Sequence, residues 1–449
     1  MIFKSILAAG AAATFVFSAS FAQAGPKEEA LEKIAECIEK QCNRLSLSGI
    51  KDLTSIPEEV LTIRKLDALD LSRTGITDLS MLAKMPWLDS LNLSGVDDID
   101  LGPVGGLKAL QSLDLSRSKV ADISAISGAT GLKNLVLSNS SVADLSPLAN
   151  LKALKRLTIR EIKVPDISAL SELSGLVMLN MAGASVSDIS PLASLGGLEE
   201  LYMGDVPVTD FSPLASLTGL KRLDVKETHI TDLSPISQLF ALNSLDISET
   251  AVSDLSPIKD LRMMQGLFLY NCPITDLSAL KNLLNLQSIY ARGAKFSDIT
   301  ALAAMADLST LDFDQTDVSD LTPLAGKAKL SSISLSETKV TDISPLADVI
   351  KLRSLALRQT GVTDLSALKG LPELNSVNIA GTAVTDISVF AGMEKFNRLD
   401  ISQTSLSDVS ALKGLPKFRY LSAYEAPRLD MAQLKELEEA GVKIRGLPK

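Results

Sequence analysis

The sequence predicts a repeat solenoid, with a curved parallel β-sheet on the concave side, short 3₁₀ or irregular turns on the convex side and helical caps at both ends. One observation is an aspartate that recurs every 22 residues from Asp78 to Asp408 without a slip. A second is a set of three leucine-rich columns with the same period, which begin at Leu66, Leu69 and Leu71. A fixed period of this length is typical of stacked units that each bury their core against their neighbours.

The leucine spacing predicts one short strand in every unit. Leu69 and Leu71 are two positions apart, which is the period of a strand with one buried face. The apolar residues that follow in the first full unit, Leu79, Leu82 and Met85, would close a return segment over that face. Each unit is therefore expected to be a strand followed by a return segment.

The return segment carries the signature of a helical turn. Serine or threonine stands two positions after the aspartate in every unit except at Gly102, and proline follows in half of the units, as in Ser146-Pro147. We expect Ser146 to accept unpaired backbone amides and Pro147 to take the first helical position, where no amide is needed. Only about one turn fits before the next leucine, which favours a 3₁₀ turn over a long helix.

These motifs resemble the leucine-rich repeat. The Leu-x-x-Leu-x-Leu pattern, with Thr-Asp-Leu-Ser-Pro-Ile-Ser at residues 231–237, is similar to the 22-residue form of the bacterial internalin-type subfamily and covers residues 45–424. One departure is that hydroxyl side chains largely replace the family's asparagine ladder, and a hydroxyl makes fewer hydrogen bonds than an amide. The resemblance implies adhesion or recognition of a host factor, although a fold of this kind does not fix a function.

The two ends of the solenoid need polar caps. Residues 25–44 are expected to form a helical N-terminal cap, with an amphipathic helix from Glu28 to Lys40. Residues 425–449 are expected to form the C-terminal cap. Its helix would run from Met431 to Ala440 and end at Gly441, before a last short strand at residues 442–444.

The three cysteines are interpreted from their positions. Cys37 and Cys42 lie in the N-terminal cap, where a disulfide requires the helix to break between them, because a continuous helix holds them too far apart. A disulfide and a pair of free buried thiols are both open at this point. Cys272 occupies the hydroxyl column and is expected to be structural.

Residues 1–24 read as a secretory signal peptide. Lys4 precedes an apolar stretch from Ile6 to Ala19, and Ala22-Gln23-Ala24 has the small residues of a cleavage site. We therefore expect a secreted or periplasmic protein with no membrane span after cleavage, because the apolar stretch is shorter than a spanning helix needs. An uncleaved anchor is the alternative. The C-terminus shows neither a hydrophobic tail nor a wall-sorting signal, which favours a released or periplasmic protein.

Composition limits the class of partner. The formal charge of −10 disfavours nucleic acid, since phosphate binding needs a basic stripe. With 46% hydrophobic but only 4% aromatic residues, the core is expected to consist of aliphatic columns. No cofactor is expected, because the sequence holds no glycine-rich phosphate loop or Cys/His cluster.

Catalytic and metal sites are disfavoured. The single histidine, His229, stands near Asp232 and Ser234, but those two residues belong to columns repeated throughout the chain. The sixteen aspartates suggest a calcium ladder, yet one carboxylate per unit supplies too few oxygens for a calcium site. We expect each aspartate to accept amides of its own turn instead.

The concave face is the candidate binding surface. Three outward-facing columns, which begin at Ala68, Asp70 and Ser72, contain all five tyrosines, whereas the first strands present only small serines. Phe268, Tyr270, Tyr290 and Arg292 should be neighbours, and aromatic and arginine clusters are the usual material of binding hot spots. The alternative is ordinary cross-strand packing, including pairing of charges such as Glu200 with their neighbours. The predicted partner-binding residues are Arg156, Arg160, Tyr202, Arg222, Lys226, Phe268, Tyr270, Tyr290, Arg292, Tyr420 and Tyr424.

The sequence therefore predicts a non-enzymatic, monomeric protein that binds another protein through its concave face. One alternative is a periplasmic structural scaffold or an inhibitor with an endogenous partner. A hydrolase, which would depend on His229, is the less favoured alternative.

Overall fold

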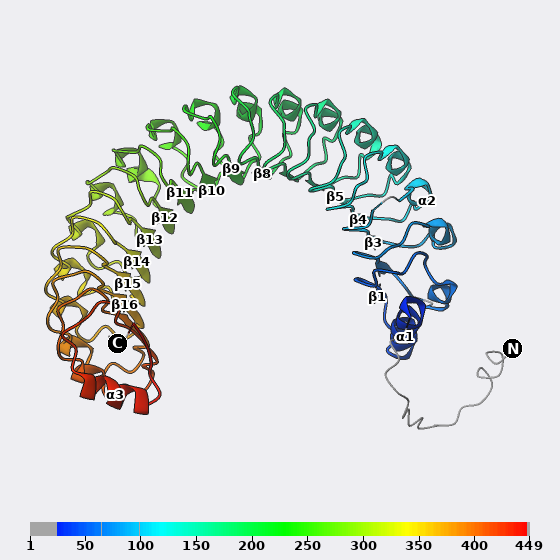
Figure 1. Ribbon diagram of the computed structural model, residues 1–449. Coiled ribbons are helices and arrows are strands. Elements are labelled where there is room, and N and C mark those ends of the chain that lie inside the picture. Colours follow the sequence, from blue (N-terminus) through cyan, green and yellow to red (C-terminus); the bar gives the residue numbers. More distant parts are fainter. Residues whose placement is uncertain (1–24, 64, 98, 447–449) are drawn as a thin grey trace, which may run out of the picture.

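The fold is an arc of stacked units with one long sheet along its inner side. The structure is a computed structural model that describes residues 25–63, 65–97 and 99–446. Strands line the inner side of the arc and short helical turns line its outer side, with α1 at one end and α3 at the other (Figure 1). The predicted signal peptide, residues 1–24, lies outside the described residues.

The sheet contains nineteen strands in the described part of the chain, and every strand pairs in parallel with the next one along the sequence. The leucine columns set the register, so that Leu69 lies opposite Leu91 and Leu91 opposite Leu113. The strands are β1 (Arg44–Ser46), β2 (Ala68–Asp70), β3 (Ser90–Asn92), β4 (Ser112–Asp114), β5 (Asn134–Val136), β6 (Arg156–Thr158), β7 (Met178–Asn180), β8 (Glu200–Tyr202), β9 (Arg222–Asp224), β10 (Ser244–Asp246), β11 (Gly266–Phe268), β12 (Ser288–Tyr290), β13 (Thr310–Asp312), β14 (Ser332–Ser334), β15 (Ser354–Ala356), β16 (Ser376–Asn378), β17 (Arg398–Asp400), β18 (Tyr420–Ser422) and β19 (Lys443–Arg445).

Each strand has only three residues because the chain turns sharply a few positions later. Three positions after each strand from β2 to β18, a residue takes a left-handed conformation, such as Arg73 with φ 55° and Glu227 with φ 56°. Glycine, which adopts this conformation without strain, fills the position in only four units, for example at Gly293 with φ 81°. The turn sends the chain away from the concave face toward the outer side.

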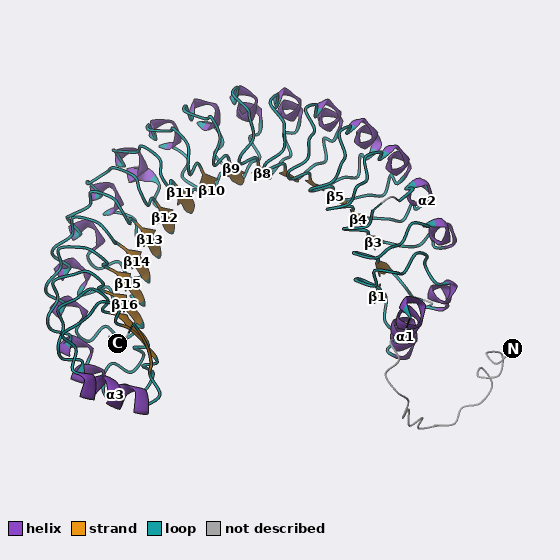
Figure 2. Cartoon of the chain, viewed as in Figure 1, coloured by secondary structure: helices purple, strands orange, loops and turns teal. Residues whose placement is uncertain are grey.

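The outer side carries one helical turn per unit, as predicted (Figure 2). The only α-helical one among the described units is α2 (Gly102–Gly105), in the unit where glycine replaces serine. The 3₁₀ turns are η1 (Glu58–Thr62), η2 (Ser80–Lys84), η3 (Ser124–Gly128), η4 (Ser146–Asn150), η5 (Ser168–Glu172), η6 (Ser190–Ser194), η7 (Ser212–Ser216), η8 (Ser234–Ile236), η9 (Ser256–Ile258), η10 (Ser278–Asn282), η11 (Thr300–Leu302), η12 (Thr322–Leu324), η13 (Ser344–Leu346), η14 (Ser366–Leu368), η15 (Ser388–Phe390) and η16 (Ser410–Leu412).

The periodic aspartate, and not the serine, holds the start of each helical turn. The carboxylate of Asp144 accepts the backbone amide of Ser146 at 2.8 Å, and the same bond recurs in all sixteen units at 2.7 to 2.9 Å. The expectation that aspartate accepts an amide of its own turn is confirmed. The expectation that Ser146 caps the turn is wrong, because its hydroxyl donates to Asp144 at 2.9 Å.

Both caps contain the predicted helices, shifted by one or two residues. The N-terminal helix α1 (Pro26–Glu39) ends early enough for Gln41, with φ 50°, to reverse the chain. Cys37 and Cys42 then approach to a Cα–Cα distance of 5.0 Å and form a disulfide. The C-terminal helix α3 (Met431–Glu439) ends just before Gly441, with φ 88°.

The core consists of the predicted leucine columns, most of whose members are fully buried. The hydroxyl column beside them donates within its own turn, as Thr250 does to the carbonyl of Ile247 at 2.6 Å. The expectation of a core without aromatic clusters is wrong in the last units. There Phe390, Phe396 and Phe418 replace aliphatic residues and stack, with centroids 4.4 and 5.9 Å apart.

Candidate protein-binding surface on the concave face

The register of the sheet places all the predicted partner-binding residues on the concave side. The middle residue of nearly every strand is buried, so the first and third residues face outward. Arg156, Tyr202, Arg222, Phe268, Tyr290 and Tyr420 occupy such strand positions. Arg160, Lys226, Tyr270, Arg292 and Tyr424 stand two residues beyond the end of a strand.

Strands β11 and β12 bring three aromatic residues together. The rings of Phe268 and Tyr290 stack with centroids 4.8 Å apart and planes inclined by 5°. The ring of Tyr270 lies 6.0 Å from that of Tyr290 and is tilted by 46°. All three side chains remain partly exposed. Because stacked aromatic side chains are rigid, this cluster presents an ordered and partly exposed apolar surface.

The aromatic cluster lies in an acidic environment. Burial, and then the nearby carboxylate of Asp312, raise the pKa of Tyr270 to about 12. Burial is also the main cause that raises the pKa of Asp312 and of Asp224 on neighbouring strands. Arg292 projects from the same surface, where its Nε donates to Gln315 at 3.3 Å. An open hollow of about 570 Å³ includes Tyr270, Arg292 and Asp312 in its lining.

Part of the predicted surface pairs internally. Tyr202 donates its hydroxyl to Glu200 at 3.0 Å, and Arg222 forms an ion pair with the other oxygen of Glu200 at 3.4 Å. Burial is the main cause that raises the pKa of Tyr202. This trio follows the alternative of cross-strand pairing, so it offers less free bonding capacity than the aromatic cluster.

The first strands are less smooth than the sequence suggested. A hollow of about 530 Å³ lies over the serines that stand two residues beyond β3, β4 and β5, and Arg73, Arg117 and Arg160 border it. Arg73 and Arg117 occupy the left-handed turn position, which sequence reasoning did not assign to this face. These units therefore present arginines as well as the small serines that the sequence indicated. Arg156 is also exposed, on the neighbouring strand β6.

The second predicted patch lies at the C-terminal end of the sheet. The guanidinium of Arg398 lies 5.1 Å from the ring centroid of Tyr420, and the ammonium of Lys443 lies 5.9 Å from it. These cations engage the ring of Tyr420. Tyr424 remains more open, with 54% of its surface exposed.

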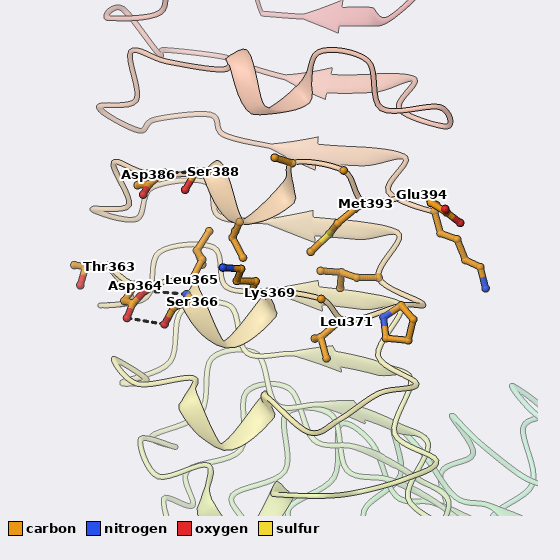
Figure 3. Close-up of a pocket in the computed structure, with 17 residues that line it drawn as sticks. Thr363, Asp364, Leu365, Ser366, Lys369, Leu371, Asp386, Ser388, Met393 and Glu394 are labelled. Carbon is orange, nitrogen blue, oxygen red and sulfur yellow. Dashed lines mark hydrogen bonds between the residues drawn. The ribbon is translucent and has the colours of Figure 1, made fainter.

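A further cavity, of about 730 Å³, lies on the convex side between η14 and η15. Asp364, Ser366, Asp386 and Ser388 line it together with Lys369 (Figure 3). The two aspartates already accept the amides of the two serines, as in the other units. These aspartates and serines are therefore already bonded as in the other units.

The residues of a hydrolase do not assemble. His229 is exposed, and the hydroxyl of Ser234 donates to Asp232 at 2.7 Å. Within the described ranges, no group of three His, Cys, Asp or Glu side chains is placed to hold a metal ion. No helix in the same ranges is long and apolar enough to cross a membrane.

Comparison with solved structures shows which known proteins have a similar fold. No family model matches the chain, and no curated protein matches it. Among solved structures, the internalin InlF of Listeria monocytogenes is similar with a TM-score of 0.61 and 30% identity, over 64% of this chain and 85% of that one. A leucine-rich-repeat protein of Leptospira interrogans is similar with a TM-score of 0.67 and 17% identity, over 92% and 98%.

InlJ of Listeria monocytogenes shares the fold as well, with a TM-score of 0.53 and 21% identity over 71% of this chain and 74% of that one. The two structures with lower identity support the solenoid architecture alone. With InlF, the similarity extends beyond the fold to the sequence, at 30% identity over 85% of the InlF chain. The chain therefore belongs to the leucine-rich-repeat proteins of the internalin type.

Proposed function

We propose that the protein binds another protein through its concave face, with the aromatic cluster of Phe268, Tyr270 and Tyr290 at the centre of the contact. A solenoid of this kind presents an extended concave surface, which is what repeat proteins use for binding. The observation that supports the proposal most is the partly exposed stack of Phe268 and Tyr290, because rigid aromatic residues dominate protein interfaces.

The context of the binding is adhesion or recognition at a host or envelope surface. We propose that residues 1–24 act as a signal peptide and that the protein works as a monomer outside the cytoplasm. The disulfide between Cys37 and Cys42 supports an oxidising compartment. A periplasmic scaffold or an inhibitor with an endogenous partner would use the same face, and only the identity of the partner separates it from an adhesin.

A binding role is favoured over catalysis because the candidate catalytic groups Ser234 and Asp232 belong to the repeated turn on the convex side. Ser234 and Asp232 bond to each other as their counterparts do in other units, and His229 makes no bond to either within the described structure. Substitution of His229 by alanine is expected to leave binding unchanged.

The proposal is tested by comparing what three versions of the purified protein capture. The first is unmodified, and the second carries alanine at Phe268, Tyr270, Tyr290 and Arg292. The matched control carries alanine at Lys259, Met263, Lys281 and Leu284, which are exposed elsewhere on the β10 and β11 units. Each protein is used on envelope and host-cell extracts, and the captured proteins are identified by mass spectrometry.

We expect a protein that is retained by the unmodified chain and by the control, but not by the concave variant. Loss of the aromatic anchors should weaken the affinity for that partner by roughly 30-fold or more, since hot-spot truncations cost about 2 kcal/mol or above. Circular dichroism must show that all three proteins are equally folded. If the three proteins capture the same set of proteins, the concave cluster is not the binding site, and a purely structural role is favoured.

A further inference from the structure

One row of side chains on the concave face combines aromatic residues with aspartates. The third residues of strands β8 to β13 lie opposite one another in the sheet, so they form a continuous line. Along that line the residues are Tyr202, Asp224, Asp246, Phe268, Tyr290 and Asp312. The stacked aromatic pair is therefore bracketed by an aspartate on each side.

The stacking leaves the outer faces of the two rings turned toward these aspartates. The planes of Phe268 and Tyr290 are nearly parallel, and their centroid separation of 4.8 Å matches the spacing of adjacent strands. The outer face of Phe268 is thus directed along the row toward Asp246, and that of Tyr290 toward Asp312. An aspartate side chain is shorter than an aromatic one, so the surface drops at each end of the aromatic pair. We call each drop a step, and a carboxylate lies at its lower side.

These carboxylates have no cation bound to them. Asp246 accepts the amide of Ser248 at 3.0 Å and Asp312 accepts the amide of Asp314 at 3.2 Å, but neither forms an ion pair in the described part of the chain. A hydrogen bond from Tyr270 and the charge of Arg292 both lower the pKa of Asp312, against the larger effect of burial. The guanidinium of Arg292 bonds to Gln315 and not to the aspartate.

Acidic groups outnumber basic ones around the row. The cations that project there are Lys226 and Arg292. The carboxylates around them belong to Asp224, Glu227, Asp246, Glu249, Asp312 and Asp314. A partner that complements this surface is basic.

On the premise of the proposed function, we propose that this row binds lysine or arginine side chains of a basic segment of the partner protein. One cation lies at the step formed by Asp246 and Phe268, and a second lies at the step formed by Tyr290 and Asp312. A cation placed there meets a carboxylate and an aromatic face together, which are the two groups that attract it most strongly in a protein.

The geometry also sets the spacing of the two cations. Asp246 and Asp312 are three strands apart, or about 14 Å at the usual separation of adjacent strands. In an extended segment, residues i and i+4 point to the same side and are separated by about 13 Å. The segment therefore carries basic residues four positions apart, and the side chain midway between them rests on Phe268 and Tyr290.

A carbohydrate is the less suitable occupant. A sugar ring stacks on an aromatic face that is open toward the groove, whereas here the inner faces cover each other and the outer faces look along the row. Asp246 and Asp312, which form no ion pair in the described structure, favour a charged ligand over a neutral one. Glycan binding is accordingly an outcome that the experiment must detect.

The test uses a labelled synthetic peptide with two arginines four residues apart around a central leucine, and with serine and glycine elsewhere. The matched peptide carries citrulline, which is neutral and of the same shape, in place of both arginines. The protein variants are Asp246→Asn with Asp312→Asn and, as a control, Asp114→Asn with Asp400→Asn. Asp114 and Asp400 occupy the same column and accept the same type of amide bond, but their strand neighbours in that column are not aromatic.

The arginine peptide is expected to bind the unmodified protein and the control variant equally, and to bind the Asp246/Asp312 variant at least roughly tenfold more weakly. The citrulline peptide should bind the unmodified protein no more tightly than the arginine peptide binds the Asp246/Asp312 variant. Equal binding of the two peptides, an equal loss in the control variant, or no binding of the arginine peptide would overturn the proposal. Binding of a neutral oligosaccharide that Phe268→Ala abolishes would overturn it as well and assign the row to a glycan.

The same variants separate this inference from the proposed function. If the protein partner identified by capture is lost from the concave alanine variant but is retained by the Asp246/Asp312 variant, the concave face binds the partner without this charge recognition. If the partner is retained by both, the face itself is not the binding site.

Discussion

At the residue scale, Lys327 is the clearest departure from the repeat. It occupies a core column otherwise filled mainly by leucine and methionine, and only 5% of its surface is exposed. Its ammonium donates to the backbone carbonyl of Leu302 at 2.9 Å and to that of Ala303 at 2.5 Å. No carboxylate pairs with it in the described structure, and burial lowers its pKa from the usual 10.5. Two backbone carbonyls therefore stabilise the ammonium of Lys327, and no carboxylate in the described structure neutralises its charge.

Replacing Lys327 by methionine should stabilise the fold. The buried column would gain an apolar side chain of similar length and lose a desolvated charge, so we expect the free energy of unfolding to rise by about 1 to 2 kcal/mol at neutral pH. The measurement is urea unfolding of both proteins. Replacement by arginine, which keeps the charge, is the control and should not stabilise.

The effect of this substitution should depend on pH. The folded-state pKa of Lys327 is lowered, so burial of the charge costs stability fully below that pKa, and the cost disappears as the pH rises toward 10.5. The advantage of the methionine variant should therefore shrink in alkaline solution. An advantage that is constant up to pH 10.5 would show that the charge is not its cause.

At the element scale, the aspartate turn is a feature that sixteen units share. In the turn of η9, the hydroxyl and the amide of Ser256 both donate to Asp254 and hold the pKa of its carboxyl below the usual 3.8. The same cause lowers the pKa of Asp78, Asp232 and Asp276 in their own turns. Each aspartate thus fixes the start of a helical turn by accepting a backbone amide.

Removing one such carboxylate should weaken the fold in a way that depends on chemistry and pH. Asp254→Ala is expected to lower the urea midpoint at neutral pH, whereas Asp254→Asn, which retains an oxygen that accepts the amide, should lower it less. Because the folded-state pKa is lowered, the stabilisation is present above pH 3.8 and is lost as the pH falls through the lower folded-state value. The difference between the unmodified protein and the asparagine variant should therefore shrink below pH 3.8. Equal midpoints for alanine and asparagine would contradict this role.

At the scale of the whole molecule, the repeat separates stability from recognition. Leucine columns pack neighbouring units together and aspartate turns fix the convex side of sixteen units, while the outward-facing residues of the strands are free to vary. The same scaffold therefore presents arginines over β3 to β6, carboxylates and aromatic rings over β9 to β13, and Tyr420 with Tyr424 at the end. Under the proposed function, this succession of charges and rings along one face would let a partner bind in one orientation.

The sequence predicted the fold and the neighbours on the concave face because the 22-residue period fixes the register of the sheet. Phe268 and Tyr290 had to lie side by side once Leu267 and Ile289 were aligned. The sequence did not predict that Arg73 and Arg117 border the same face, because arginine gives no signal for the left-handed turn that directs them there. The sequence also assigned the cap to Ser146. Asp144 and Ser146 both carry a side-chain oxygen near the free amide, and the sequence does not indicate which of them accepts it.

The most direct test of a concave binding face is site-specific photocrosslinking. A photoreactive phenylalanine analogue is placed at Tyr290, in the aromatic cluster, or at Lys259, which follows η9 on the convex side. Each protein is irradiated with the captured partner, and crosslinked products are counted by mass spectrometry. The account predicts crosslinks from position 290 and none from position 259. Crosslinks from position 259 without any from position 290, in a protein that still binds the partner, would contradict it.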